Sequence, residues 1–82
     1  MKVIILTPEK KIFEGEVEIL TVKSRSGQIS VLSNHAPLVT AVDSGIIILK
    51  TKEGKKVFEN ERGFLKTRNN RTSLLLRKCK EK

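Results

Sequence analysis

The sequence predicts an all-β domain, either a β-sandwich or a small β-barrel. Apolar and polar residues alternate with a period of two in segments such as Val17–Lys23 and Gly27–Leu32, which is the pattern of strands that turn one face to a core. Pro, Gly and Asn separate these segments at short intervals and indicate turns. About nine or ten short strands at this spacing are typical of a sandwich or a barrel.

The first predicted strand is the apolar run Lys2–Leu6. Pro8 follows it and stops it, because proline has no N–H to donate to a sheet. A second strand is expected to begin at Lys11–Phe13. Gly15, which lies between two glutamates, indicates a bulge or a tight bend in this strand.

The third predicted strand, Val17–Lys23, shows the clearest alternation. We expect Val17, Ile19 and Val22 to point toward the core. Ile29–Val31 alternates again and predicts the fourth strand.

The next strands are predicted from the turns between them. Leu38–Val42 and Ile46–Thr51 are separated by Asp43-Ser44-Gly45. Lys52-Glu53-Gly54-Lys55 predicts a hairpin turn, because its glycine adopts positive φ without steric cost. The chain then pairs back through Val57–Glu59.

Asn69-Asn70 predicts a second hairpin turn, which joins Phe64–Lys66 to Thr72–Leu76, because Asn tolerates the left-handed region. Residues 57–65 also fit helical spacing. Gly63 would cost such a helix ~1 kcal/mol, and the two charged residues before it would interrupt the apolar stripe. Strands are therefore the preferred interpretation.

Two apolar runs, Val3–Leu6 and Ile46–Leu49, are expected to form strands that are covered on both faces. All three phenylalanines, Phe13, Phe58 and Phe64, lie in strand patterns and are expected in the core. Neither run approaches the ~18–20 residues that a membrane span requires, and no signal-peptide pattern is present. The sequence thus predicts a soluble intracellular protein.

The charge is strongly positive and unevenly distributed. The formal net charge is +8 over 82 residues: residues 1–41 carry five Lys and Arg against four Glu, and residues 42–82 carry twelve against five Asp and Glu. This basic half indicates either a solvated face or an acidic partner. A small basic nucleic-acid-binding barrel is one alternative, but the chain has no Trp or Tyr on which bases would stack.

Enzymatic motifs are largely missing. His35 is the only histidine and Cys79 the only cysteine, and no Gly-rich phosphate loop occurs. Glu14, Glu16 and Glu18 recur with period two, which favours a solvated strand face over an acid–base pair. Cys79 lies among lysines that would activate it, although an inert surface thiol is the simpler interpretation. We expect no catalytic residue, no metal site and no cofactor.

Five short motifs occur in order along nearly the whole chain. Together they resemble the N-terminal β-sandwich domain of the epsilon subunit of F-type ATP synthases. The motifs are Thr7-Pro8-Glu9, Phe13–Glu18, His35–Leu38, Asp43-Ser44-Gly45 and Gly63-Phe64-Leu65.

The resemblance implies a flattened β-sandwich of two roughly five-stranded, mostly antiparallel sheets over residues 1–76, followed by a basic tail over residues 77–82. Members of the family usually continue into a C-terminal helical hairpin that can block rotation and in some binds ATP. The six residues after Leu76 fall short of the ~12–15 that a stable helix needs. We therefore expect neither hairpin-type inhibition nor an ATP site.

The resemblance also implies a function and two partners. It implies a non-catalytic central-stalk subunit that bridges the gamma subunit and the membrane ring and couples translocation of protons (or sodium ions) to ATP synthesis. Thr7, His35 and Thr40 are then expected at the gamma-facing surface. The ring is expected to contact the loop whose tip is Gly27 and Gln28. That loop comprises Lys23, Ser24, Arg25, Ser26, Gly27, Gln28, Ile29 and Ser30.

The implied location is peripheral, on the cytoplasmic side of a bacterial inner membrane, with the plastid or mitochondrial equivalent as the alternative. Membrane association is expected through the complex alone. Three departures from the family pattern stand out. Arg25, Ser26 and Gln28 replace acidic residues that are usual in the ring-facing loop. Ser33-Asn34 replaces a Pro-Gly pair, and Arg62-Gly63 replaces a Gly-Gly pair.

Overall fold

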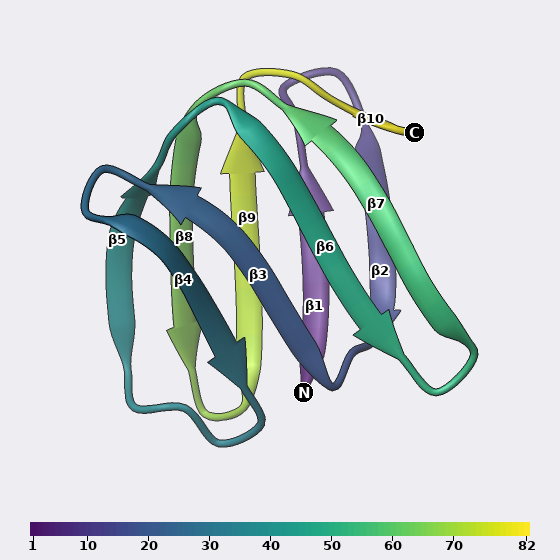
Figure 1. Cartoon of the computed structure of the whole chain (residues 1–82), viewed down its shortest axis with the longest axis vertical. Coiled ribbons are helices and arrows are strands. Elements are labelled where there is room, and N and C mark those ends of the chain that lie inside the picture. The colour runs from purple at the N-terminus through teal and green to yellow at the C-terminus, as the bar shows by residue number, and fades with distance from the viewer.

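The computed structural model describes all 82 residues as ten strands in two stacked sheets (Figure 1). The predicted all-β sandwich is confirmed. The structure contains no helix, and hence none that is long and apolar enough to cross a membrane. The strands are β1 (Lys2–Leu6), β2 (Lys11–Glu16), β3 (Ile19–Ser24), β4 (Gly27–Leu32), β5 (Leu38–Val42), β6 (Gly45–Thr51), β7 (Gly54–Asn60), β8 (Gly63–Arg68), β9 (Arg71–Leu76) and β10 (Cys79–Glu81).

Each sheet has five strands, as the resemblance implied. Sheet A has the strand order β2-β1-β9-β8-β5, and sheet B has the order β10-β7-β6-β3-β4. Every neighbouring pair is antiparallel except β1 and β9. This parallel pair runs in register from Lys2 opposite Arg71 to Leu6 opposite Leu75, and it joins the first and the ninth strands in one sheet.

The hairpins use the backbone freedom that their sequences predict. Gly54 closes the β6–β7 turn with φ of +129°, and Gly27 closes the β3–β4 turn with φ of +120°. Asn69 and Asn70 adopt φ of 53° and 60° between β8 and β9. The Asn69-Asn70 turn has positive φ at both positions, which matches the twist of antiparallel strands. Both predicted hairpins are confirmed by the antiparallel pairing of β6 with β7 and of β8 with β9.

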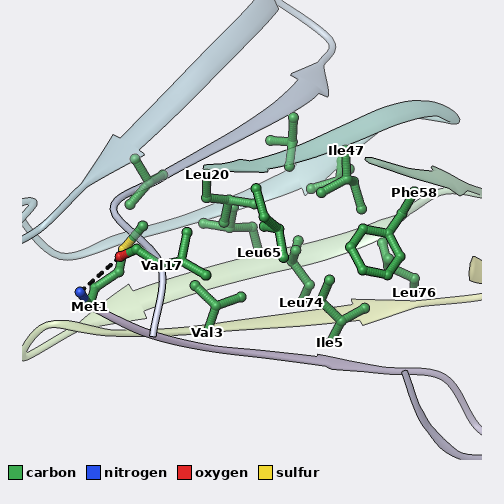
Figure 2. Close-up of a cluster of buried hydrophobic side chains, with 14 residues drawn as sticks. Met1, Val3, Ile5, Val17, Leu20, Ile47, Phe58, Leu65, Leu74 and Leu76 are labelled. Carbon is green, nitrogen blue, oxygen red and sulfur yellow. Dashed lines mark hydrogen bonds between the residues drawn. The ribbon is translucent and has the colours of Figure 1, made fainter. Parts of the chain in front are cut away.

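The core lies between the two sheets and contains fourteen buried apolar residues (Figure 2). Phe58 is its largest side chain, and its ring meets the ring of Phe13 edge-on, with centroids 6.1 Å apart and an interplanar angle of 68°. Both sheets contribute about equally. The core comprises Met1, Val3, Ile5, Val17, Leu20, Val22, Val31, Val42, Ile47, Leu49, Phe58, Leu65, Leu74 and Leu76.

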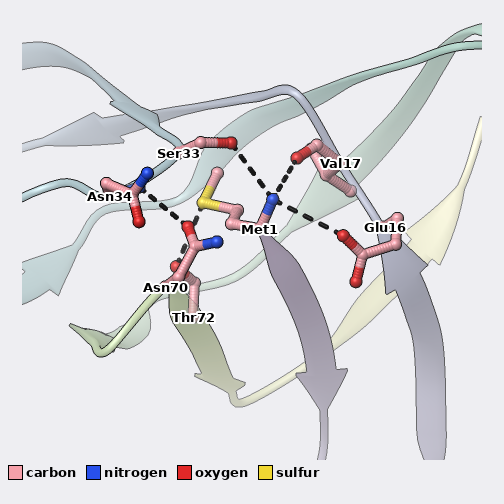
Figure 3. A network of polar contacts seen from close by, with 7 residues as sticks. All are labelled: Met1, Glu16, Val17, Ser33, Asn34, Asn70 and Thr72. Carbon is pink, nitrogen blue, oxygen red and sulfur yellow. Dashed lines mark hydrogen bonds and ion pairs between the residues drawn. The ribbon is translucent and has the colours of Figure 1, made fainter.

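A polar network closes one end of the sandwich (Figure 3). The amino group of Met1 donates to the carbonyl of Val17 at 3.0 Å and to Oγ of Ser33 at 3.2 Å, and it lies 3.6 Å from a carboxylate oxygen of Glu16. The Thr72 hydroxyl donates to the buried sulfur of Met1 at 3.4 Å. These contacts tie the start of β1 to the crossover between the sheets.

The two apolar runs are not covered on both faces, contrary to expectation. Val3 and Ile5 are fully buried, but Ile4 between them is only half-buried. In β6, Ile48 is half-buried and Ile46 is 38% exposed. Only two sheets stack here, so each strand has one core face and one outer face, and an unbroken apolar run must place apolar residues outside.

The predicted register of the third strand is also wrong at one position. Val17 is buried, but it precedes the strand, which begins at Ile19. Leu20, Val22 and Ser24 then face the core, while Ile19 lies half-buried on the outer face. The chain crosses from sheet A to sheet B after Val17, and this crossing resets the alternation.

Gly15 does not form the expected bulge. The β1–β2 register shifts between Ile5 and Leu6, while Gly15 pairs regularly with Val3. A Cβ at Gly15 would lie 3.2 Å from the ring of Phe13. The glycine therefore provides space for an aromatic ring on the core side of β2.

The last residues form a strand where a tail was expected. Cys79–Glu81 is β10, which pairs antiparallel with β7 at the edge of sheet B. Alternating charges in this segment obscured the strand, because its pairing depends on backbone hydrogen bonds more than on apolar burial.

Candidate functional site

The residues assigned to the ring form the β3–β4 hairpin. Its tip is Arg25 and Ser26, not Gly27 and Gln28 as expected, since the latter two already pair within β4. The hydroxyl of Ser24 donates to the carbonyl of Gly27 at 2.7 Å and closes the turn from inside. The most protruding side chains of this hairpin are therefore a cation and a small hydroxyl.

Most of this hairpin is available to a partner, but two of its residues are not. Ser24 is only 5% exposed, and Ile29 is half-buried on the core side. The N–H of Asp43 donates to the carbonyl of Lys23 at 2.9 Å, so the β5–β6 turn supports the base of the hairpin. The exposed members are Lys23, Arg25, Ser26, Gly27, Gln28 and Ser30.

Thr7 lies just after β1 and shapes the turn into β2. Its hydroxyl donates to the carbonyl of Lys10 at 3.2 Å and accepts from the N–H of Lys10 at 3.3 Å. The side chain is half-buried, and both of its hydrogen bonds are made within this turn.

His35 lies in the loop between β4 and β5, at the other end of the sandwich from Thr7 (Figure 1). Its N–H donates to the carbonyl of Leu32 at 3.1 Å, and its Nδ1 donates to the carbonyl of Ala36 at 2.7 Å. The ring is thus held by its own loop, which leaves Nε2 without a partner within the chain.

Thr40 is half-buried in the edge strand β5, opposite the buried Leu65. Its side chain therefore points toward the core side of sheet A. The structure does not bring Thr7, His35 and Thr40 into one cluster. A single partner can touch all three only by covering a broad part of the domain.

The outer face of sheet A carries an apolar row that the sequence did not reveal. By register, Leu6, Leu75, Phe64 and Ala41 lie side by side across β1, β9, β8 and β5. Phe64 is 60% exposed and Leu75 is 54% exposed, and the nearby Val39 is 68% exposed. We call these five residues the apolar row.

Phe64 was expected in the core, and that expectation is wrong. Leu65 and Thr67 on β8 are buried, so alternation places Phe64 and Lys66 on the outer face. Gly63 is the first residue of the same strand. A Cβ at this position would lie 2.8 Å from the Cα of Leu76 and would collide with the backbone of β9. This close approach explains why glycine is needed at position 63 even though Arg replaces the preceding glycine.

A cationic row lies on the same outer face, four residues along the strands from Leu6, Leu75 and Phe64, and Lys66 and Ser73 lie between the two rows. Lys2, Arg71 and Arg68 are in register across β1, β9 and β8, and Lys66 lies on the same face of β8. Lys2 is paired with Glu14, its Nζ lying 3.1 Å from Oε2. The other three cations have no carboxylate partner within the chain.

Glu14 is the carboxylate that pairs with Lys2 and with Lys11. Lys11 Nζ donates to Oε1 of Glu14 at 2.7 Å. Hydrogen bonds from Lys11 and then from Lys2, together with their positive charges, hold the pKa of Glu14 below its ordinary value of 4.5. The carboxylate is therefore already engaged and does not offset the arginines.

Sequence comparison decides the family of this domain. A profile of the β-sandwich domain of the ATP synthase delta/epsilon chain matches residues 1–82. The chain belongs to this family.

Individual relatives agree with this assignment. The chain is 39% identical over 75 residues to the ATP synthase epsilon chain of Leptospira interrogans serogroup Icterohaemorrhagiae, an alignment that covers 92% of this chain and 59% of the relative. It is 35% identical over 81 residues to the chloroplastic epsilon chain of Cyanidioschyzon merolae, covering 99% and 62%. The chain thus spans about three fifths of the length of these relatives.

Solved structures show the same fold. A chain of the mitochondrial ATP synthase of Euglena gracilis superposes with a TM-score of 0.90 at 18% identity, covering 96% of this chain and 51% of that one. A chain of the Tetrahymena thermophila mitochondrial ATP synthase central stalk and c-ring gives a TM-score of 0.80 at 15% identity, covering 96% and 64%. These two chains therefore share the sandwich fold of this domain.

The phenylalanines of this delta/epsilon-type domain do not form a platform for nucleic-acid bases. Phe58 is buried and Phe13 packs against it in the interior. Phe64 alone is exposed, whereas binding of single strands uses several stacked aromatic side chains. This distribution disfavours the nucleic-acid alternative.

A polar hollow of about 480 Å³ lies between the β1–β2 turn and the ends of β7 and β10. Cys79 lines it beside Asn60, whose Oδ1 is buried without a hydrogen-bond partner. Burial raises the pKa of the Cys79 thiol, so the neighbouring lysines do not activate it. The interpretation of Cys79 as an unreactive thiol fits the structure better than the activated alternative.

Proposed function

We propose that this domain acts in a non-catalytic central-stalk subunit of an F-type ATP synthase. In this role it bridges the gamma subunit and the membrane ring, and so couples translocation of protons or sodium ions to ATP synthesis. The proposed location is peripheral, on the cytoplasmic side of a bacterial inner membrane. Membership of the delta/epsilon family supports the assembly, and the exposed apolar row supports the docking of a protein partner.

The apolar row is the single observation that carries the proposal for gamma. Phe64, Leu75 and Val39 are each more than half exposed on one face, and a continuous apolar patch on a soluble domain marks a protein interface. Aromatic side chains are also enriched at interface centres. Gamma is therefore proposed to cover the outer face of sheet A, with Thr7, His35 and Thr40 at the margins of the contact.

The β3–β4 hairpin is proposed to meet the ring. Its tip, Arg25 and Ser26, projects from the end of sheet B, and Asp43 supports its base through the carbonyl of Lys23. Contacts at a face of sheet A and at an end of sheet B leave a stiff sandwich held at two places. Such an arrangement resists shear under torque, which is what a rotating coupling element requires.

Binding to gamma tests the first contact. We expect Phe64→Ser to weaken binding of the gamma subunit from the same genome at least tenfold in calorimetry, because interface aromatic residues contribute about 2 kcal/mol or more. Leu32→Ser is the matched control, since Leu32 is 51% exposed on the outer face of sheet B. Equal binding by both variants would refute docking on sheet A.

Cross-linking tests the second contact. In a Cys79→Ser background, Ser26→Cys is expected to form a disulfide with a cysteine placed in the polar loop of the ring subunit in the assembled complex. Lys52→Cys, at the β6–β7 turn at the opposite end of sheet B (Figure 1), serves as control and is expected to remain unlinked. A cross-link from position 52 alone would show that the ring meets the other end.

A further inference from the structure

The cationic row has a structural cost within the isolated domain. Arg68 and Arg71 lie directly opposite each other across the β8–β9 hairpin, and Arg71 also lies opposite Lys2. Like charges that face each other across strands are destabilising. Lys2 is relieved by Glu14, but no carboxylate of the chain pairs with either arginine.

The backbone of the hairpin that carries these arginines is held in place at its turn. Asn69 and Asn70 hold a turn with positive φ at both positions. The side-chain oxygen of Asn70 accepts from the backbone N–H of Asn34 at 2.8 Å (Figure 3). This bond fastens the turn to the β4–β5 loop that contains His35. The two arginines are therefore carried by a fixed turn on the same face as the apolar row, with Lys66 between Arg68 and Phe64.

We propose that the gamma subunit presents carboxylates to Arg68, Arg71 and Lys66. Its contact surface would then have an apolar strip that covers the apolar row and an acidic strip that faces these three cations. This inference rests on the proposed function and adds to it the chemistry of the partner surface. Arg forms bidentate hydrogen bonds with carboxylates. Complementary charge at the border of an apolar contact sets the orientation and the rate of association.

The apolar row on the same face favours a protein over other acidic partners. Phosphates of nucleic acid or of lipid headgroups neutralise arginines, but they do not remove Phe64, Leu75 and Val39 from water. A protein surface covers both rows at once, because apolar and acidic side chains can lie side by side on one element.

The test compares Arg68→Gln/Arg71→Gln with Lys52→Gln/Lys78→Gln. Both double variants remove two positive charges, and neither Lys52 nor Lys78 takes part in an ion pair. Association with gamma is followed by stopped flow over a range of salt concentrations. The arginine variant is expected to associate at least about threefold more slowly at about 0.05 M salt, and to converge with wild type near 1 M, where the Debye length is ~3 Å.

Thermal unfolding of the free domain provides a second measurement, in which the arginine substitutions are expected to increase stability although they slow association with gamma. Relief of like-charge repulsion is expected to raise Tm of Arg68→Gln/Arg71→Gln by about 1–5 °C, while the same change weakens association. Arg68→Lys/Arg71→Lys keeps the charges and is expected to retain most of the wild-type association rate. A merely structural role for the arginines would instead lower both Tm and binding.

The outcomes separate this inference from the proposed function. If wild type does not bind gamma, the proposed function fails. If wild type binds but the arginine variant associates as fast as the lysine control, the acidic strip is refuted while docking stands. Arginine-dependent retention of oligouridine RNA or of phosphatidylglycerol vesicles, with gamma association unchanged, would also overturn it.

Discussion

Phe58→Ala tests the assignment of the core. Phe58 is 1% exposed, and its ring meets Phe13 edge-on from the opposite sheet. Truncation of a buried Phe to Ala costs about 3–5 kcal/mol, including the cavity that it leaves. At about 0.05–0.15 kcal/mol per residue, a domain of 82 residues has roughly 4–12 kcal/mol in total. The substitution therefore removes a large fraction of the stability.

The assay is urea unfolding followed by circular dichroism. With an m-value of about 1 kcal/mol/M for a small domain, the midpoint is expected to fall by about 3–5 M or the variant to be unfolded without urea. Phe64→Ala is the matched control, because its ring is 60% exposed, and it is expected to change stability by about 1 kcal/mol or less. A loss below 1 kcal/mol for Phe58→Ala, or a larger loss for Phe64→Ala, would show that the two rings have been assigned to the wrong faces.

Three further substitutions test local features. Gly63→Ala is expected to destabilise by about 3 kcal/mol or more, because its Cβ would collide with the backbone of β9; a change below 1 kcal/mol in urea unfolding would contradict that close approach. Glu14→Gln is expected to lower Tm at pH 7 but not at pH 3. The pKa of Glu14 is depressed by Lys11 and Lys2, so its contribution is present above pH 4.5 and is lost as pH falls through the lowered pKa; a Tm difference that does not change with pH would refute this. Asn70→Ala is expected to cost about 1–2 kcal/mol and Asn70→Gly less, since glycine keeps the positive φ and loses only the hydrogen bond; equal losses would show that the backbone conformation contributes nothing.

Local chemistry made most of the fold predictable. The hairpin turns at Gly54 and at Asn69-Asn70 were correctly predicted, because few residues accept positive φ. Strand positions followed from alternation and proline. Ile4 and Phe64 were wrongly expected to be buried, because a run of apolar residues does not show which member faces the core. β10 was missed because its pairing with β7 depends on a neighbour far away in the sequence.

The candidate site was less predictable, because it arises from pairing between distant strands. Leu6 and Leu75 become neighbours only through the parallel β1–β9 pair. Arg68 and Arg71 are visible in the sequence as a basic hairpin, but the alignment of Arg71 with Lys2 depends on the pairing of β9 with β1. Alternation alone gives the two faces of a strand, and only the register gives the rows across a sheet.

The most direct test of the docking face is an NMR titration of the isotopically labelled 82-residue chain with unlabelled gamma subunit from the same genome. We expect the largest shift and intensity changes at Val39, Phe64 and Leu75 on sheet A, with Leu32 and Ile46 on sheet B unaffected by direct contact. Changes centred on sheet B, or no change at any concentration of gamma, would contradict the proposal that the outer face of sheet A binds gamma.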